Sequence, residues 1–239
     1  MSKNENTENM ERMEIHPIAH IHTDFPAKFG IPRQSGLVEE LEGLIVMEPV
    51  YRSPEAFRGI EGFSHLWLIW QFSENVREGW SPTVRPPRLG GNVRMGVFAT
   101  RSPFRPNSLG LSCVKLLGLE QDDKLGPLLR VAGADLMDGT PIFDIKPYTP
   151  LADCHPEARG GFTEINTDYL LDVEIPEHWL SRIPEEKREA LRGVLAQDPR
   201  PSYQRDSSRV YGMTFAGLEV RFRVEGKCLT VCEVQIGRN

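Results

Sequence analysis

The sequence predicts a mostly β fold, a barrel or a sandwich, followed by a smaller α+β unit. Short runs of β-branched and apolar residues recur along the chain, and glycine and proline separate them. Apart from one segment near residue 190, long amphipathic helical patterns are absent. The GxGxxG fingerprint is missing as well, so a doubly wound, Rossmann-type sheet is not expected.

Strand-like runs follow one another through the first half of the chain. The first two, IHPIAHIHTDF and LEGLIVMEPVY, lie on either side of a loop-like insert, KFGIPRQSGLV. Residues 63–72, FSHLWLIWQF, read as one continuous apolar run and predict a strand that is buried on both faces. The runs SCVKLLGLE, LRVAGADL and TPIFDIKPY predict further strands.

The pattern changes after a turn-rich region at 152–167. The stretch PEEKREALRGVLAQD at 184–198 predicts the one regular helix, because proline suits an early helical position and its leucines and valine fall on one side. Strands then follow to the end of the chain. We therefore expect a first β domain at 14–170 and a small α+β domain at 171–239.

The N-terminus and the composition limit the compartment. The segment MSKNENTENMERME is polar and lacks an apolar stretch after a basic start, so we expect a disordered tail at 1–13 and no secretory signal. No apolar run is long enough to span a membrane. The four cysteines match no zinc spacing, and disulfides are not expected. A cytoplasmic protein without a membrane partner is the prediction.

A block without carboxylates, residues 79–119, is the most informative feature for function. The chain has a net charge of −6, yet this block carries six positive charges, at Arg85, Arg88, Arg94, Arg101, Arg105 and Lys115. Ordinary surfaces mix both signs. Glycine and proline around the arginines favour close approach of a ligand, and the arginine fork suits carboxylate and phosphate groups. The block predicts an anion-binding site, although a loop with arginines paired elsewhere is the alternative.

Two other groups of polar residues are open to two interpretations each. His16, His20 and His22 share one face of a strand and could hold a metal, but no acid or cysteine stands close by, so a surface strand is favoured. The segment 135–148 holds acids, Lys146 and Tyr148. It predicts either a hairpin with a salt-bridged outer face or a polar cluster at a barrel mouth that binds or shuttles a proton.

Five segments carry a resemblance to a known family: PRQSGL at 32–37, FSHLWL at 63–68, RPPRLGGNVRMGVFATRSPFRPNSLGLS at 85–112, DLMDGTPIFDIKPY at 135–148 and QDPRPSY at 197–203. In this order they look like the TsaA-like, or TrmO, family. The resemblance implies an S-adenosylmethionine-dependent methyltransferase that acts on N6 of threonylcarbamoyladenosine at tRNA position 37. It further implies a β-barrel that forms a homodimer and binds the cofactor near the subunit interface, followed by a small C-terminal domain. We expect this domain to contact tRNA, and we expect no metal.

The resemblance also implies the residues of the cofactor site. Contacts to S-adenosylmethionine are expected at Gln34, Ser35, Gly36, Phe72, Ser73, Arg101, Leu111, Leu136, Met137, Asp138 and Gly139. Ser73 stands where a histidine is common, so its backbone is the expected contact. Ser108 stands where a proline often follows the asparagine of FRPN, which loosens a turn without removing a functional group.

Catalytic roles are suggested by the chemistry that the resemblance implies, and RNA contacts by the charge pattern of the block at 79–119 and of QDPRPSY. The acceptor N6 loses a proton on methylation, and Asp138 or Asp144 could accept it, with Lys146 and Tyr148 in the same cluster. The expected contacts to the anticodon stem-loop are Arg85, Arg88, Arg105, Arg200 and Tyr203.

Two other function classes stay open. A non-enzymatic RNA-binding barrel would explain the arginines but not the cluster at 135–148. A metal-dependent barrel enzyme would use the three histidines and leave the arginines unexplained.

Overall fold

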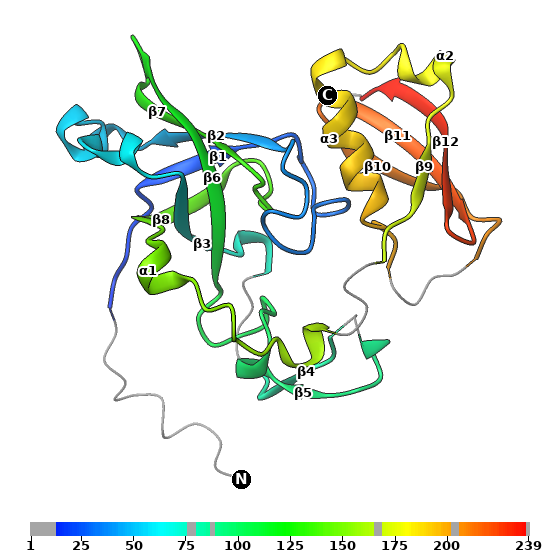
Figure 1. Ribbon diagram of the computed structural model, residues 1–239, viewed down its shortest axis with the longest axis horizontal. Coiled ribbons are helices and arrows are strands. Elements are labelled where there is room, and N and C mark those ends of the chain that lie inside the picture. The colour runs from blue at the N-terminus through cyan, green and yellow to red at the C-terminus, as the bar shows by residue number, and fades with distance from the viewer. Residues whose placement is uncertain (1–12, 76–79, 87–88, 165–168, 202–205, 238–239) are drawn as a thin grey trace.

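The computed structural model describes residues 13–75, 80–86, 89–164, 169–201 and 206–237, so nearly all of the expected tail at 1–13 lies outside the described residues. Two β lobes make up most of the molecule, the first built by the N-terminal part of the chain and the second by the C-terminal part (Figure 1).

The first lobe is a closed, six-stranded antiparallel barrel with the strand order β1-β2-β7-β6-β3-β8. Its strands are β1 (Ala19–His22), β2 (Glu42–Met47), β3 (His65–Gln71), β6 (Leu109–Asp122), β7 (Gly126–Ala132) and β8 (Thr140–Pro147). Pairing of β1 with β8 closes the sheet on itself, with Ala19 opposite Ile142. The mostly β prediction is confirmed, and the barrel rather than the sandwich is the form adopted.

Strand β3 has one buried face and one outward face, so the expectation of burial on both faces was wrong. Leu66, Leu68 and Trp70 point into the barrel and are at most 7% exposed. Trp67 and Ile69 alternate with them on the outer wall and are half-buried. Successive side chains of a strand point to opposite faces, and the barrel fills only one of them.

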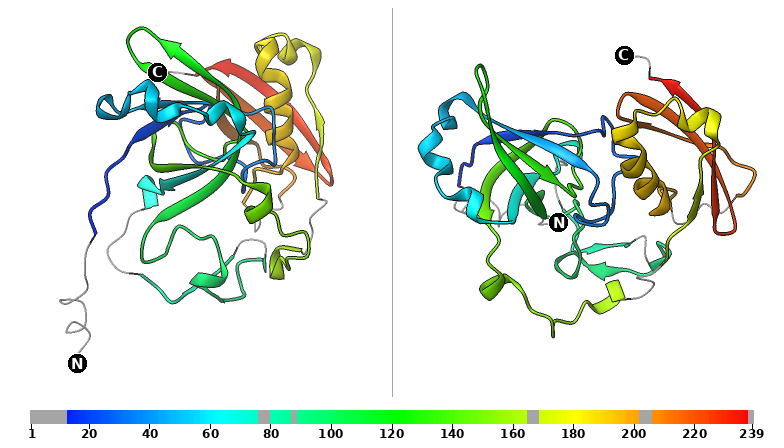
Figure 2. Two further views of the ribbon diagram at one scale, coloured as in Figure 1. Left: turned by 60° about the vertical axis from the view of Figure 1, so that its left-hand side comes forward. Right: turned by 45° about the horizontal axis from the view of Figure 1, so that its top comes forward.

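A long connection between β3 and β6 extends away from the barrel. It contains the short hairpin β4 (Thr83–Val84) and β5 (Met95–Gly96). In Figures 1 and 2 this hairpin lies apart from both β lobes, on the same side as the segment that follows helix α1 (Pro150–Asp153). Within the carboxylate-free block, the described residues from 80 to 108 therefore form an arm of the molecule, and residues 109–119 belong to β6 in the wall of the barrel.

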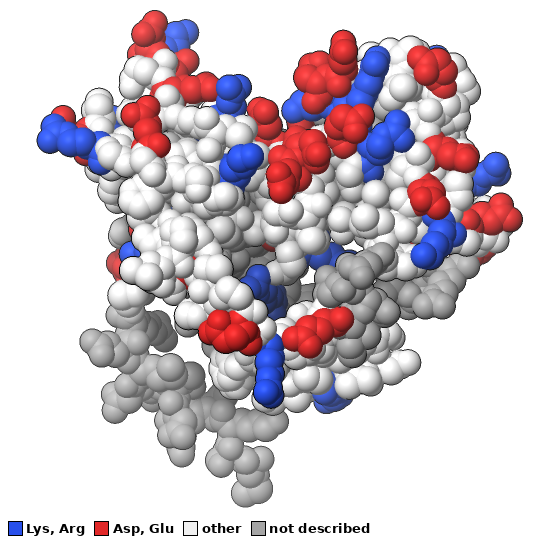
Figure 3. Space-filling view, viewed as in Figure 1, with Lys and Arg blue, Asp and Glu red and all other residues white. Residues whose placement is uncertain are grey.

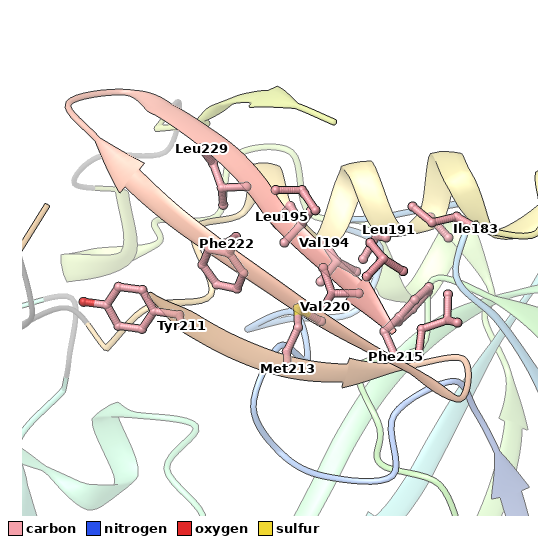
Figure 4. Close-up of a cluster of buried hydrophobic side chains, with 14 of the residues drawn as sticks. Ile183, Leu191, Val194, Leu195, Tyr211, Met213, Phe215, Val220, Phe222 and Leu229 are labelled. Atoms are coloured by element: carbon pink, nitrogen blue, oxygen red, sulfur yellow. The ribbon is translucent and has the colours of Figure 1, made fainter. Parts of the chain in front are cut away.

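The second lobe is a four-stranded sheet, of order β10-β11-β12-β9, with a helix on one face. Its elements are β9 (Asp172–Glu174), α2 (Glu177–Leu180), α3 (Glu185–Ala196), β10 (Tyr211–Phe215), β11 (Leu218–Glu225) and β12 (Cys228–Ile236). Leu191, Val194 and Leu195 of α3 pack onto Val220 and Phe222 of the sheet (Figure 4). The predicted helix is confirmed, and it follows Pro184 directly.

The loop between β1 and β2 belongs to the core of the second lobe. Phe25, Val38 and Leu41 are at most 3% exposed and pack with the residues of the C-terminal sheet and helix. The Ala216 N–H donates to the Asp24 carbonyl at 2.9 Å, and Lys187 forms an ion pair of 2.7 Å with the Asp24 carboxylate. The barrel keeps a separate core of its own, and the β1–β2 loop holds the two lobes together by burial in the second core as well as by chain connectivity.

Candidate active site

An open cleft lies where one end of the barrel meets the arm and the loop at 28–34. Its volume is about 2030 Å³. Most of its lining belongs to the segments 31–34, 69–74, 80–86, 98–111 and 160–163. Figure 3 shows Lys and Arg side chains in the hollow at the middle of this face, while acidic side chains gather along the upper part of the molecule. The cleft therefore brings together segments that are far apart in the sequence.

The described lining of the cleft is strongly basic. Its charged side chains are Lys28, Arg33, Arg85, Arg94, Arg101 and Arg105 on the basic side and Glu74 and Asp135 on the acidic side. Such a cleft in an acidic protein attracts anions locally while the rest of the surface does not. This lining is consistent with the anion-binding site that was predicted for the block at 79–119.

The PRQSG loop is fixed to the barrel next to the cleft. The Gly36 N–H donates to the Gly133 carbonyl at 2.9 Å, and Ser35 Oγ accepts from the Cys113 N–H at 3.2 Å. Gly36 has a φ of 77°, a conformation that favours glycine. The side chain of Gln34 accepts a hydrogen bond from the Arg101 guanidinium. The loop and the arm are thus joined at two residues that were both predicted to contact the cofactor.

A chain of hydrogen bonds lies at the floor of the cleft. The Trp70 indole N–H donates to Ser112 Oγ at 2.9 Å, and the Ser112 hydroxyl donates to Asp135 Oδ1 at 2.6 Å. Burial raises the pKa of Asp135, and the hydrogen bond from Ser112 and the charge of Arg101 oppose that shift. Sequence reasoning counted Asp135 only among the acids of the segment 135–148 and did not select Ser112, because the three hydrogen-bonded residues come from three separate segments.

The LMDG turn, residues 136–139, is anchored to β1, and one of its residues lines the cleft. Met137 lines the cleft, whereas the Leu136 side chain is only 1% exposed and can offer only its backbone. Asp138 Oδ1 accepts from the Thr23 N–H and contacts His22 Nδ1, each at 3.1 Å. The Gly139 N–H donates to the Ile21 carbonyl at 2.8 Å. Asp138 therefore ties the turn to the end of β1, and its side chain does not line the cleft.

The other candidate catalytic residues lie on the outer wall of the barrel. Asp144 and Lys146 form an ion pair of 3.1 Å, and the Tyr148 ring packs on Trp67 at 5.9 Å. None of the three lines the cleft. The salt-bridged outer face was one of the two interpretations of this segment, and the structure shows it. The accompanying hairpin is not formed, because β8 pairs with β1 and β3 and not with β7.

The predicted RNA contacts fall into three groups. Arg85 and Arg105 line the cleft. Arg88 and Tyr203 lie outside the described residues. Arg200 donates two hydrogen bonds to the Asp198 carboxylate, at 2.8 and 2.9 Å, and its side chain is only 10% exposed. The structure therefore gives Arg200 a partner within its own turn, and a phosphate contact there remains a prediction.

The remaining lining residues include several aromatic rings. Phe72 packs against Trp70 with ring centroids 4.3 Å apart and the ring planes tilted by 59°, at the cleft end of β3. Trp80 and Phe98 face each other at 6.1 Å on the arm and are 54% and 74% exposed. Sequence reasoning missed this second pair, since the two residues are 18 positions apart and only the fold of the arm brings them together.

Two of the three histidines pair with carboxylates. His20 pairs with Glu48 at 2.9 Å and His22 with Asp138 at 3.1 Å, while His16 is exposed. Across the described residues, no group of three or more His, Cys, Asp or Glu side chains is arranged to hold a metal ion. Nor does any helix in the described part of the chain have the length and apolarity needed to cross a membrane.

Comparison with known proteins gives matches along nearly the whole chain. Residues 20–154 match the tRNA-methyltransferase O N-terminal domain, and residues 169–236 match the TrmO C-terminal domain. A tRNA (adenine(37)-N6)-methyltransferase from Escherichia coli K12 is 40% identical over 223 residues, which cover 90% of this chain and 94% of that protein. Another from Eikenella corrodens is 48% identical over 163 residues, covering 68% of this chain and 92% of that protein.

A solved structure agrees with these matches. The crystal structure of TrmO from P. aeruginosa superposes with a TM-score of 0.78 and 33% identity, covering 96% of this chain and all of that one. The barrel with its basic cleft and the C-terminal lobe are each similar to a known domain. The chain belongs to the tRNA-methyltransferase O family.

Proposed function

We propose that this protein methylates tRNA, transferring a methyl group from S-adenosylmethionine to N6 of threonylcarbamoyladenosine at position 37. The observation that carries the proposal is the near full-length similarity to tRNA (adenine(37)-N6)-methyltransferases. The basic cleft supports it, because a tRNA substrate brings phosphates and the threonyl group brings a carboxylate. The proposal places the enzyme in the cytoplasm, with tRNA as its partner.

The residues of the cleft fit S-adenosylmethionine. The ligand offers a carboxylate, an adenine ring and a positively charged sulfur. Arg101, held by Gln34, suits the carboxylate, and the Phe72 ring suits a flat base. Leu111 and Met137 add apolar surface to the lining. Ser35, Gly36, Leu136, Asp138 and Gly139 shape the loops behind these side chains, and Ser73 lies beside Phe72.

Bound S-adenosylmethionine supplies an electrophilic methyl group to the N6 atom. The protein contributes chiefly by holding the acceptor base in line with that group, since alignment is the main demand of such a displacement. The basic lining binds the RNA backbone and the threonyl carboxylate. The proton of N6 must leave as the new bond forms, and we retain Asp138 as a candidate acceptor because its neighbour Met137 lines the cleft.

Trp80 and Phe98 suit a role in holding the RNA. Single-stranded loops are commonly bound by stacking their bases on aromatic side chains. This exposed pair lies within the basic cleft, where a base of the anticodon loop could stack while the neighbouring arginines bind phosphates.

A homodimer is part of the proposal. On the outer wall, Ile69 lies opposite both Leu111 and Asp144, and Trp67 lies opposite both Cys113 and Lys146. Leu111 is 53% exposed, so this wall offers apolar surface next to the cleft. A dimer formed through it would place Asp144, Lys146 and Tyr148 at the subunit interface, where they could still contribute to the site. We also retain the division into domains at 14–170 and 171–239.

One assay tests the function directly. Methyl incorporation from labelled S-adenosylmethionine is measured with two bulk tRNA preparations, one with and one without the threonylcarbamoyl modification. Incorporation only into the modified preparation is the expected result. Equal incorporation into both would overturn the substrate assignment, and none in either would favour the alternative of an RNA-binding barrel without methyltransferase activity.

A further inference from the structure

Asp135 is a partly buried carboxylate in a cleft whose described lining is otherwise mostly basic. Of the two acids in that lining, Glu74 is exposed at the rim, whereas Asp135 lies at the floor. A buried carboxylate is costly unless charges or hydrogen bonds compensate it. A carboxylate at this position therefore needs an explanation beyond the surface charge pattern.

The hydrogen bonds around Asp135 hold its carboxyl group in place. Ser112 donates to Oδ1 at 2.6 Å, and Ser112 is itself fixed by the Trp70 indole at 2.9 Å. Ser112 is 1% exposed and Trp70 is 7% exposed, so neither side chain is free to turn away. Arg101 influences Asp135 through space, but its guanidinium donates to Gln34. Asp135 is therefore a carboxyl group fixed in position and in contact with the cleft.

We propose that Asp135 is the counter-charge for the positively charged sulfur of S-adenosylmethionine and that it thereby distinguishes this cofactor from the demethylated product. The inference rests on the proposed function. The sulfur is cationic before transfer and a neutral thioether afterwards, because the electron pair of the broken S–C bond stays on sulfur. An attraction between Asp135 and the sulfur exists only before transfer. Asp135 thus favours cofactor binding and product release together.

A purely structural role for Asp135 makes a different prediction. The Ser112 hydroxyl could simply need an acceptor, and Asp135 could keep the PRQSG loop and β6 in register. Loss of that role would disturb the pocket for every ligand to a similar extent. A role as counter-charge affects only ligands with a cation at the position of the sulfur, so the ratio of two affinities separates the two roles.

The experiment uses the Asp135→Asn variant, which keeps the shape and an acceptor for Ser112 but removes the charge. Calorimetry of the full-length protein gives the Kd of S-adenosylmethionine and of S-adenosylhomocysteine, which share every group except the methyl and its charge. We expect the Kd of S-adenosylmethionine to rise about tenfold, equivalent to about 1.4 kcal/mol, and the Kd of S-adenosylhomocysteine to change less than about threefold. Asp172→Asn, an exposed substitution in β9, is the matched control and should change neither value.

Equal weakening of both ligands in the Asn variant would overturn the proposal in favour of the structural role. If that variant does not fold, the wild-type protein still provides a test. It should bind an analogue with a protonated amine in place of the methylsulfonium about tenfold more tightly than S-adenosylhomocysteine. Equal affinity for the two would also overturn the proposal. Failure of the wild-type protein to bind S-adenosylmethionine at all would instead refute the proposed function.

Discussion

Side chains in the cleft act through fixed neighbours. Gln34 accepts from Arg101, and Ser112 links Trp70 to Asp135. Each of these hydrogen bonds joins segments that are far apart in the sequence, so the position of one side chain depends on the folding of another segment. A group held in this way binds its ligand without losing much conformational freedom.

Substitution of Arg101 tests the cofactor site. Arg101→Ala removes a guanidinium that we assign to the carboxylate of S-adenosylmethionine and that now bonds Gln34. Binding should weaken by about 1.5–3 kcal/mol, the usual value for a hydrogen bond to a charged group. Calorimetry measures it, with Arg130→Ala as a control, because Arg130 pairs with Glu120 on a distant hairpin. Parental affinity together with unchanged turnover would remove Arg101 from the site.

At the scale of the element, the arm between β3 and β6 is the most unusual part of the molecule. Its hairpin is short, none of its described residues belongs to either hydrophobic core, and its described arginines line the cleft. An arm of this kind contributes little to the core, so its composition is free to serve binding. Two predictions separate its charges from its aromatic rings.

The arginines of the arm should contribute to the salt dependence of tRNA binding. Arg85→Ala and Arg105→Ala should each weaken binding and reduce the slope of log affinity against log salt by about one unit, because each lost phosphate contact releases one counterion fewer. Affinity for S-adenosylmethionine should stay the same. Arg223→Ala, on an exposed position of β11, serves as the control. An unchanged slope in both arm variants would mean that these arginines are structural.

The aromatic pair of the arm should contribute to the affinity for RNA but not to its salt dependence. Trp80→Ala and Phe98→Ala each remove an exposed ring and no charge. Stacking of one base on an aromatic side chain contributes about 1–3 kcal/mol, so binding of the anticodon stem-loop should weaken by that amount. The salt slope should not move. Filter binding at several salt concentrations measures both quantities, and full affinity in the double variant would exclude a stacking role.

For the whole molecule, the sequence predicted the types of element better than their arrangement. The helix at 185–196 could be predicted because proline and an apolar stripe mark it locally. Closure of the barrel could not, since it depends on β1 meeting β8 across more than a hundred residues. For the same reason the outward position of Asp144 and Lys146 was uncertain, because it is decided by the pairing of β8 with β3. Periodicity shows which residues share a face, and only packing shows where that face points.

Assembly provides a prediction at the same scale. The outer wall with Leu111, Ile69 and Trp67 offers apolar surface, and we expect it to form a two-fold dimer. The chain has a mass of 27.1 kDa, and sedimentation equilibrium at micromolar concentration should give twice that mass. Trp67→Glu should shift the equilibrium towards monomer, whereas Glu225→Gln on the C-terminal lobe should not. A monomer in the wild-type protein would contradict the prediction.

Packing of the β1–β2 loop into the core of the C-terminal lobe predicts that the two lobes unfold together. Phe25 comes from the loop after β1, is 1% exposed, and meets Phe215 of β10 edge to face with ring centroids 5.3 Å apart. Phe25→Ala should lower the free energy of unfolding by about 3–5 kcal/mol, the usual cost of truncating a buried phenylalanine. Leu151→Ala, on a fully exposed side chain of α1, should lower the free energy of unfolding only slightly.

Urea denaturation followed by intrinsic fluorescence and by far-ultraviolet circular dichroism should give coincident transitions in the wild-type protein. Because Phe25 packs into the C-terminal lobe while its chain segment begins in the barrel, loss of this ring should separate the two transitions. Two separate transitions already present in the wild-type protein would show that packing of the β1–β2 loop does not couple the lobes.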